Sequence, residues 1–234
     1  MKREISMESA ELLYENWPGQ FNTFSHMEFA CSIPQSLFLI STLKENGQPN
    51  LCFHSWSCFG GDEGGYFAVM QNVSHSSHTY ENIVRENEFC INFVSADYYS
   101  NCIATITHNS ANDDEFAAGH FTAEKSAKIK TPRVREAFMT LECQLACNVD
   151  LTRKGINSMI IGRVLHASVD EKYIEGVDLR YGKKGFMFNI HEPADYATGQ
   201  LDDTYVATLE VLGSYPELKN KPFGEQNYEQ NMFL

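Results

Sequence analysis

Two apolar runs joined by a polar turn form the clearest hydrophobic pattern of the chain. Residues 36–43 are apolar and β-prone, residues 50–59 form a second such run, and Asn46-Gly47 lies between them. Asn-Gly between two apolar runs is a strong signal for a hairpin, because both residues tolerate the positive φ angles of a tight turn. The pattern therefore predicts a β-hairpin in which residues 50–59 return as one strand.

The later apolar runs predict further strands. These are expected at 66–70, 89–94, 140–152 and 158–169, and the last two form a second hairpin around a polar turn. Gly162 interrupts the last run. A glycine inside a strand indicates a bulge or a close approach of another group to the backbone.

The helical pattern is confined to short segments. Residues 79–86 place Tyr80, Ile83 and Val84 on one side of a predicted helix, and Ser77 is a suitable N-cap for it. Other short helices are expected at 8–15, 98–106, 113–118 and 132–138. Because there is no regular β-α-β alternation, we expect an antiparallel barrel with helices over its ends rather than a doubly wound sheet.

The length and charge of the chain limit its functional class. A chain of 234 residues with 43% hydrophobic residues can form one domain with a full core. The net charge of −13 argues against a nucleic-acid-binding or anionic-membrane surface. No apolar run approaches the ~20 residues of a membrane span, and residues 1–8 lack the apolar segment of a signal peptide, so we expect a cytoplasmic location.

Cysteine and histidine positions show no metal-binding pattern. The seven cysteines include no Cys-x-x-Cys pair, so we interpret them as buried thiols in a reducing compartment. His26, His54, His75 and His78 match no spacing typical of metal ligands. We therefore predict neither a metal site nor a catalytic side chain.

A series of short motifs runs through residues 34–170. In chain order they are Pro34, Ser41-Thr42, Gly47, Pro49-Asn50-Leu51, Ser55, Thr79, Asn82-Ile83, Glu88-Phe89, Ile91-Asn92, Asp114-Glu115-Phe116, Pro132, Leu141-Glu142-Cys143 and Ile161-Gly162-Arg163-Val164. In this order and spacing the motifs resemble those of the flavin reductase-like family, whose members bind FMN in a split β-barrel.

The resemblance implies a fold, an activity and an assembly. The fold would be mainly β, an FMN-binding split β-barrel with Greek-key topology and short helices over its ends. One domain would span residues 1–234, with the barrel core at 34–212 and with a helix at 8–16 and an arm at 215–234 as appendages. The implied activity is hydride transfer from NAD(P)H to FMN. Family members are usually homodimers with the flavin near the subunit interface.

The resemblance places the FMN phosphate at the start of the helix predicted over 79–86. Ser77, His78 and Thr79 would bind it together with backbone N–H groups, because a helix N-terminus combines free donors with a positive dipole end. Asn82 would also contact the cofactor. Alternatively, Ser77 and Thr79 only cap the helix, His78 is a polar loop residue, and Asn82 bonds a neighbouring loop.

The resemblance places the flavin ring against the first hairpin. Ser55, Trp56 and Ser57 combine an apolar surface with hydroxyl and backbone groups that suit the polar edge of the ring. His120 lies in a region that the resemblance places over the open face of the flavin, where it would contact the substrate. Alternatively, the two serines face solvent, Trp56 packs in the core or a dimer interface, and His120 is a surface residue.

Two positions depart from the family pattern. Many relatives have Lys-Asp immediately before the threonine, where this chain has Ser77-His78, so a charged contact to the phosphate requires protonated His78 or another cation. Many relatives also have a histidine near the nicotinamide site, where this chain has Asn157. Two further interpretations therefore stay open: a flavin- or haem-binding module or sensor without turnover, and a flavin-free structural protein.

Overall fold

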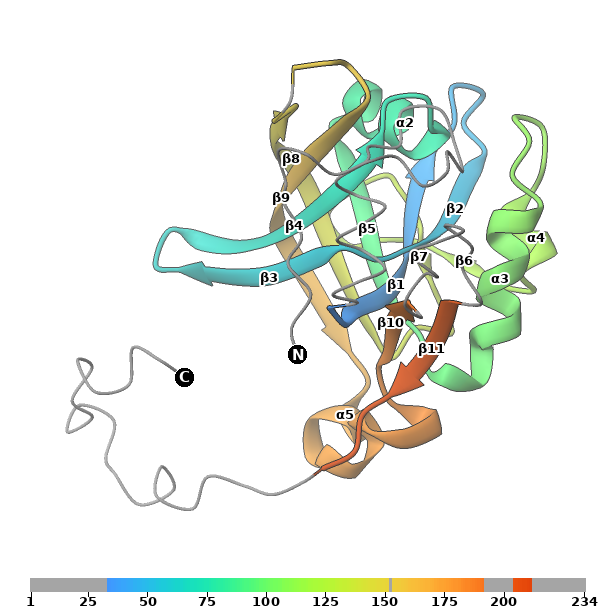
Figure 1. Ribbon diagram of the computed structural model, residues 1–234, viewed down its shortest axis with the longest axis vertical. Helices are drawn as coiled ribbons and strands as arrows, with labels where there is room; N and C mark the ends of the chain where they lie inside the picture. The colour runs from blue at the N-terminus through green and yellow to red at the C-terminus, as the bar shows by residue number, and fades with distance from the viewer. Residues whose placement is uncertain (1–32, 152, 192–203, 212–234) are drawn as a thin grey trace, which may run out of the picture.

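The computed structural model describes residues 33–151, 153–191 and 204–211, and β-strands predominate among them (Figure 1). The strands are β1 (Gln35–Leu43), β2 (Pro49–His54), β3 (Ser57–Asp62), β4 (Gly65–Ser74), β5 (Glu88–Phe93), β6 (Ala123–Glu124), β7 (Arg133–Val134), β8 (Met139–Val149), β9 (Asn157–Val169), β10 (Met187–His191) and β11 (Thr204–Thr208). The helices are α2 (His78–Glu86), α3 (Tyr99–Thr107), α4 (Glu115–Ala118) and α5 (Glu171–Glu175), with 3₁₀ turns η1 (Ala96–Tyr98), η2 (Val177–Arg180) and η3 (Gly182–Lys184). The mainly β prediction is confirmed, whereas the predicted helix at 8–16 and arm at 215–234 lie outside the described residues.

The main sheet is antiparallel and rolls up on itself. Its order is β11-β10-β1-β5-β8-β9-β4-β3, and β2 pairs with β1. β1 therefore has three partners: its first residues pair with β10, and the remainder lies between β2 and β5. β3 therefore lies at one end of this order and β2 pairs only with β1 near the other, although the two strands follow each other directly in the chain (Figure 1).

The crossing from β2 to β3 occurs at Ser55 and Trp56. Trp56 has a left-handed backbone with a φ of 54°, and its carbonyl accepts a hydrogen bond of 2.7 Å from the N–H of Gln71 on β4. The first hairpin is confirmed, but the prediction of one continuous strand over 50–59 is wrong. The strand ends because the left-handed backbone of Trp56 turns the chain. The residues before it pair with β1, and the residues after it pair with β4.

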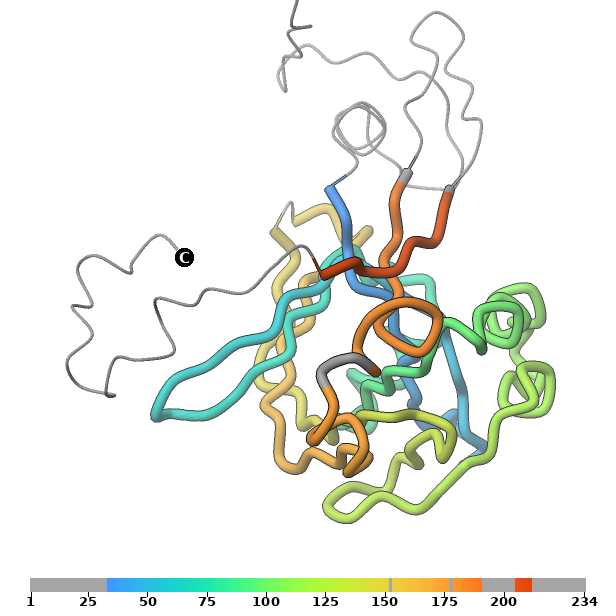
Figure 2. Tube along the Cα trace, turned by 90° about the horizontal axis from the view of Figure 1, so that it is seen from below, coloured from blue at the N-terminus to red at the C-terminus, as the bar shows by residue number. Residues whose placement is uncertain are grey.

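Two apolar clusters lie on the two faces of β1. Phe38 and Ile40 belong to the cluster that also contains Phe89 and Ile160, while Leu37 and Leu39 belong to a second cluster with Leu51, Cys102, Phe116 and Met187. The second cluster includes side chains of α3 and α4, which lie beside β2 on the outside of the barrel (Figures 1 and 2). Burial on both faces explains why β1 is a continuous apolar run rather than an alternating one.

The segment predicted as a helix at 132–138 has a different structure. Arg133 and Val134 form β7, which pairs with β6. The N–H of Val134 donates to the side-chain oxygen of Asn92 at 2.9 Å, and Arg133 forms an ion pair with Glu124 at 2.7 Å. The helix prediction was wrong because these tertiary contacts, which the local pattern does not contain, engage the polar groups of the segment.

The loop between β6 and β7 is held by two carboxylates. The fully buried side chain of Glu142 accepts hydrogen bonds from the N–H groups of Ala127 and Lys128 at 2.8 and 2.6 Å. Glu88 accepts hydrogen bonds from the N–H groups of Lys130 and Thr131 at 2.8 and 2.7 Å. Carboxylates on β5 and β8 thus satisfy backbone donors that no strand partner satisfies.

Two features of the fold were not anticipated. β3 and β4 form a hairpin that extends away from the barrel (Figures 1 and 2), and β10 and β11 extend the sheet beyond β1, in a region for which the sequence predicted no element. None of the helices in the described ranges is long and apolar enough to span a bilayer.

Gly162 on β9 shows the close approach expected of a glycine inside a strand. A Cβ atom at this position would lie 2.3 Å from the Phe89 ring and 3.0 Å from the Cβ atom of Cys143. We expect Gly162→Ala to lower the free energy of unfolding by about 2 kcal/mol, because the ring must move within a packed core. Urea unfolding followed by circular dichroism measures this change.

Gly60 provides the matched control, because a Cβ atom there meets no atom within 4 Å. Gly60→Ala should change the free energy of unfolding by less than about 0.5 kcal/mol. Equal effects of the two substitutions would contradict the packing described for Gly162.

Candidate functional site

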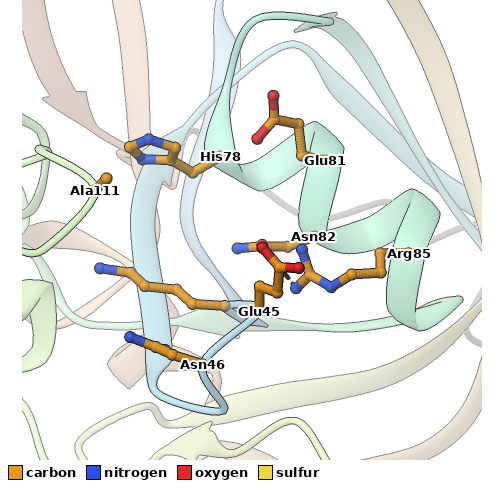
Figure 3. Close-up of a pocket in the computed structure, with 8 residues that line it drawn as sticks. Glu45, Asn46, His78, Glu81, Asn82, Arg85 and Ala111 are labelled. Carbon is orange, nitrogen blue, oxygen red and sulfur yellow. Dashed lines mark hydrogen bonds between the residues drawn. The ribbon is translucent and has the colours of Figure 1, made fainter.

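Two pockets contain four of the eight predicted site residues, and they share no lining residue. The apolar pocket has a volume of about 310 Å³ and is lined by Leu37, Phe53, His54, Ser55, Trp56, Tyr99, Ile103, Ile106, Asn189 and Val206. The polar pocket has a volume of about 420 Å³ and is lined by Lys44, Glu45, Asn46, His78, Glu81, Asn82, Arg85 and Ala111 (Figure 3). Both volumes are typical of small-molecule sites.

The apolar pocket lies where β2 ends. Phe53, Trp56 and Tyr99 contribute aromatic side chains, and α3 contributes Ile103 and Ile106. Buried Ser55 accepts a hydrogen bond of 3.4 Å from the side-chain amide of Asn189 on β10. The pocket therefore combines apolar walls with a small number of polar groups.

His54 supplies an unusual polar group to the apolar pocket. Burial lowers the pKa of His54 to about 4, an effect that a hydrogen bond to the backbone of Gln71 opposes only in part. The imidazole is therefore neutral near pH 7. Its Nε2 atom is buried and has no hydrogen-bond partner within the described ranges. A neutral ring that donates its single N–H to the Gln71 backbone presents Nε2 as an acceptor.

Ser77 acts as the N-cap of α2, and this function uses its hydroxyl group. The Ser77 hydroxyl accepts from the N–H of Tyr80 at 3.2 Å and donates its one proton to the carbonyl of Ser74 at 2.7 Å. The cap leaves the N–H groups of His78 and Thr79 without an acceptor among the described residues. These two N–H groups, at the positive end of the helix, remain available to an anion.

The predicted residues of α2 differ in their surroundings. His78 lines the polar pocket, and its Nδ1 atom is buried without a partner in the described part of the chain. Thr79 is buried, and its hydroxyl hydrogen-bonds the thiol of Cys52. Asn82 donates to the hydroxyl of Thr42 at 3.0 Å and accepts from Arg85 at 2.9 Å. Thr79 and Asn82 therefore join α2 to the first hairpin.

Cys52 does not have the properties of a reactive thiol. Burial raises its pKa to about 11, although the hydrogen bond with Thr79 opposes this shift, and the nearby charge of Glu115 raises the pKa further. A thiol with this pKa is protonated near neutral pH and is a weak nucleophile.

Lys44 brings an unanticipated cation to the polar pocket. Its ammonium group pairs with Glu115 at 3.0 Å, and the exposed fractions of the two side chains are only 8% and 0%. It also donates to the carbonyl of Asp113. Arg85, in the last turn of α2, lines the same pocket. Lysine in a turn gives no local signal of such a role, because the fold alone brings β1 beside α2.

The remaining predicted residues lie apart from one another. Ser57 hydrogen-bonds the hydroxyl of Ser36 at 3.1 Å, and His120 is exposed, follows α4 with a φ of 54° and lines neither pocket. Asn157 pairs with Ser74 in the register of β4 and β9. A search of the described residues finds no group of three His, Cys, Asp or Glu side chains that could hold a metal ion.

The structure thus divides the predicted site into two parts. Ser55 and Trp56 share the apolar pocket, and His78 and Asn82 share the polar pocket. His54 is the main functional candidate that the sequence interpretation missed. Its position two residues before Trp56, on the opposite strand face from Ser55, was the available signal.

Comparisons with known proteins agree with this architecture. A family model described as "Flavin reductase like domain" matches residues 30–188. The chain is similar to the structure of a putative flavin reductase with a split barrel domain from Shewanella frigidimarina, with a TM-score of 0.66, 22% identity and coverage of 85% of this chain and 94% of the other.

Two further structures share the fold. One is nitrilotriacetate monooxygenase component B from Bacillus cereus, with a TM-score of 0.65, 18% identity and coverage of 88% and 100%. The other is the 2-nitrobenzoate 2-nitroreductase NbaA of Pseudomonas fluorescens, with a TM-score of 0.65, 20% identity and coverage of 95% and 100%. These similarities confirm the predicted split barrel.

The N-cap of α2 gives a direct test of the function of Ser77. We expect Ser77→Ala to lower the free energy of unfolding by about 1 kcal/mol, because the N–H of Tyr80 loses its acceptor. Ser77→Asp should retain most of the stability, since aspartate also caps helices. Urea unfolding of the three proteins makes the comparison, and an unaltered Ser77→Ala protein would contradict the cap.

His54 predicts a dependence of stability on pH. As the pH falls from 6.5 to about 4, the unfolded chain binds a proton at His54 that the folded chain does not bind. The free energy of unfolding should therefore decrease by up to about 3 kcal/mol across this range and should gain nothing further from His54 above it. Urea unfolding between pH 7 and pH 4 measures the slope. His54→Phe should flatten it, and parallel curves would refute the assignment.

Proposed function

Because the chain belongs to the flavin reductase-like family, we propose that it is an FMN-binding oxidoreductase that transfers a hydride from a nicotinamide donor to the flavin. The observation that carries the proposal is the apolar pocket with the unpartnered Nε2 of His54 in its lining. Aromatic walls and one buried acceptor suit a flat heteroaromatic ring that carries an N–H group.

The flavin ring fits the apolar pocket chemically. Phe53, Trp56 and Tyr99 offer apolar contacts to its faces, and its pyrimidine edge carries an N–H group between two carbonyls. In this proposal the N–H group donates to Nε2 of His54, while Ser55 and Asn189 lie among the polar groups available to the edge. The N–H group of the ring would supply the hydrogen-bond donor that Nε2 of His54 lacks among the described residues.

The phosphate of FMN fits the start of α2. The N–H groups of His78 and Thr79 are available, and Nδ1 of His78 lies buried beside them without a partner in the described ranges. Lys44 and Arg85 line the adjoining polar pocket. They supply positive charge near the phosphate, as the lysine before the threonine does in many relatives.

The protein contributes binding and orientation in this proposal, and the bound flavin supplies the redox chemistry. Neutral His54 and protonated Cys52 do not act as nucleophiles. The apolar walls exclude water from the ring, and the hydrogen bonds at its edge fix which face is open to the nicotinamide.

We also propose that the working form is a homodimer. Tyr99 and Ile106 line the apolar pocket and are 39% and 42% exposed, so an apolar ridge borders the proposed ring site. A second copy of the chain over this ridge would complete the enclosure of the flavin.

A flavin-binding module without turnover is the second candidate. Asn157, in place of the histidine that many relatives carry, favours it because the contact to a nicotinamide donor would be weaker. A titration with FMN that follows quenching of its fluorescence, and then addition of NADH or NADPH without oxygen, separates the two candidates. Binding followed by bleaching of the flavin supports the oxidoreductase, binding without bleaching supports the module, and no binding rejects both.

Ser55→Trp tests the placement of the flavin ring. The indole would fill the apolar pocket, so we expect FMN binding to be lost while circular dichroism shows a folded protein. His120→Asn is the control, because His120 is exposed and lines neither pocket, and asparagine tolerates its left-handed backbone. The control should bind FMN normally, and normal binding by Ser55→Trp would place the ring elsewhere.

A further inference from the structure

Both cations that line the polar pocket already have a carboxylate partner. Lys44 pairs with Glu115 at 3.0 Å, and the exposed fractions of the two side chains are 8% and 0%. Arg85 pairs with Glu86 at 2.8 Å and also donates to the side-chain oxygen of Asn82. The N–H groups of the two cations remain donors, but the charges within each pair largely cancel. The two pairs therefore offer little net positive charge to an anion.

The remaining charged side chains of the pocket lining are negative. Glu45, in the turn after β1, and Glu81, in the first turn of α2, both line the pocket and are exposed. Neither carboxylate forms an ion pair with another described residue. Solvent and salt weaken the field of these two groups without reversing its sign.

The neighbouring elements bring carboxylates and a second histidine to the start of α2. On the side of the loop that carries Ala111, the carboxylates of Asp113 and Asp114 accept from backbone N–H groups. At the end of β4, the ring of His75 has a hydrogen-bond partner on β9. Among the described side chains that line the pocket, His78 is therefore the one that can still gain a positive charge.

His78 is well placed to become this cation. Its Nδ1 atom is buried without a partner among the described residues, beside the available N–H groups at the start of α2. A neutral ring with its proton on Nε2 presents a lone pair at Nδ1, which repels an anion, whereas a protonated ring presents N–H groups at both nitrogens. Figure 3 shows the ring directed toward the loop of Ala111, with Arg85 at the far side of the pocket.

We propose that His78 takes up a proton when the FMN phosphate binds at the start of α2, so that the affinity for FMN depends on pH. The inference rests on the proposed function, which places the phosphate at this end of the helix. A phosphate monoester carries a charge of about −1.5 to −2 at pH 7. This charge and those of Glu45 and Glu81 favour the protonated ring in the complex. The affinity should therefore be higher near pH ~6.5 and fall as the pH rises, because a proton must then be taken from a more dilute source.

Calorimetric titration of FMN into the full-length protein measures the proton directly. Titrations at about pH 7.5, in buffers that differ in ionisation enthalpy, give the number of protons bound with each FMN. We expect an uptake approaching about one proton per FMN. The dissociation constant should rise by up to about tenfold per pH unit between pH ~7.5 and ~8.5.

Three variants assign the proton to a side chain. His78→Asn removes the titrating ring, so the uptake should vanish and the affinity near pH ~6.5 should fall about tenfold. His78→Lys supplies a permanent cation, so FMN should bind without uptake of a proton and with little dependence on pH. His108→Gln, at the exposed end of α3, is the matched histidine control and should retain the uptake.

Two results would overturn this inference and leave the proposed function intact. FMN binding without uptake of a proton would mean that neutral His78 carries its single proton on Nδ1. Uptake that persists in His78→Asn would assign the proton to the phosphate or to another group. If His78→Asn binds too weakly to be titrated, uptake by His78→Lys overturns the inference in the same way, and its absence there supports it. A protein that binds no FMN at any pH would reject the proposed function and this inference together.

Discussion

Closure of the barrel requires Trp56 to adopt a left-handed backbone conformation. Residues before Trp56 pair with β1 and residues after it pair with β4, and the hydrogen bond from the N–H of Gln71 to the carbonyl of Trp56 ties this crossing to β4. A bulky residue in this conformation costs about 1–3 kcal/mol, which the surrounding contacts must offset. The ring of Trp56 lies edge-on to His54 with centroids 6.2 Å apart. Ser55 and Trp56, where the chain crosses from β2 to β3, thus both serve barrel closure and line the apolar pocket.

The first hairpin changes character along its length. Phe38 and Ile40 face the apolar core, whereas Cys52, opposite Ile40, and Thr42 hydrogen-bond Thr79 and Asn82 of α2. These bonds fix the start of α2 over the barrel, and the N-cap of the helix leaves two N–H groups free there. The same contacts therefore hold the helix in place and keep its N-terminus open to a ligand.

Local signals in the sequence predicted those parts of the fold that depend on local physics. The Asn46-Gly47 turn, the Ser77 cap and the close contact at Gly162 follow from the conformational preferences of single residues, and all three are present. The break at Trp56 was not predictable, because barrel closure between distant strands imposes it. The role of Lys44 depends on the fold, which brings α4 and α2 beside the turn that follows β1. The acceptor at His54 depends on the hydrogen bond that its ring makes to the Gln71 backbone on β4. Sequence patterns therefore predicted four residues that line the two pockets, but they did not predict His54 or Lys44 as site residues or the division into two pockets.

The loop between β6 and β7 has a consequence for how the protein can vary. Glu142 and Glu88 bind its main-chain N–H groups, and its own side chains contribute little to this attachment apart from the hydroxyls of Ser126 and Thr131. Substitutions at Ala127, Lys128 and Lys130 leave the bonded atoms unchanged. An insertion or deletion would displace the N–H groups from their carboxylates, with a buried charge left unsatisfied. This loop should accordingly be permissive to sequence drift and intolerant of any change in length.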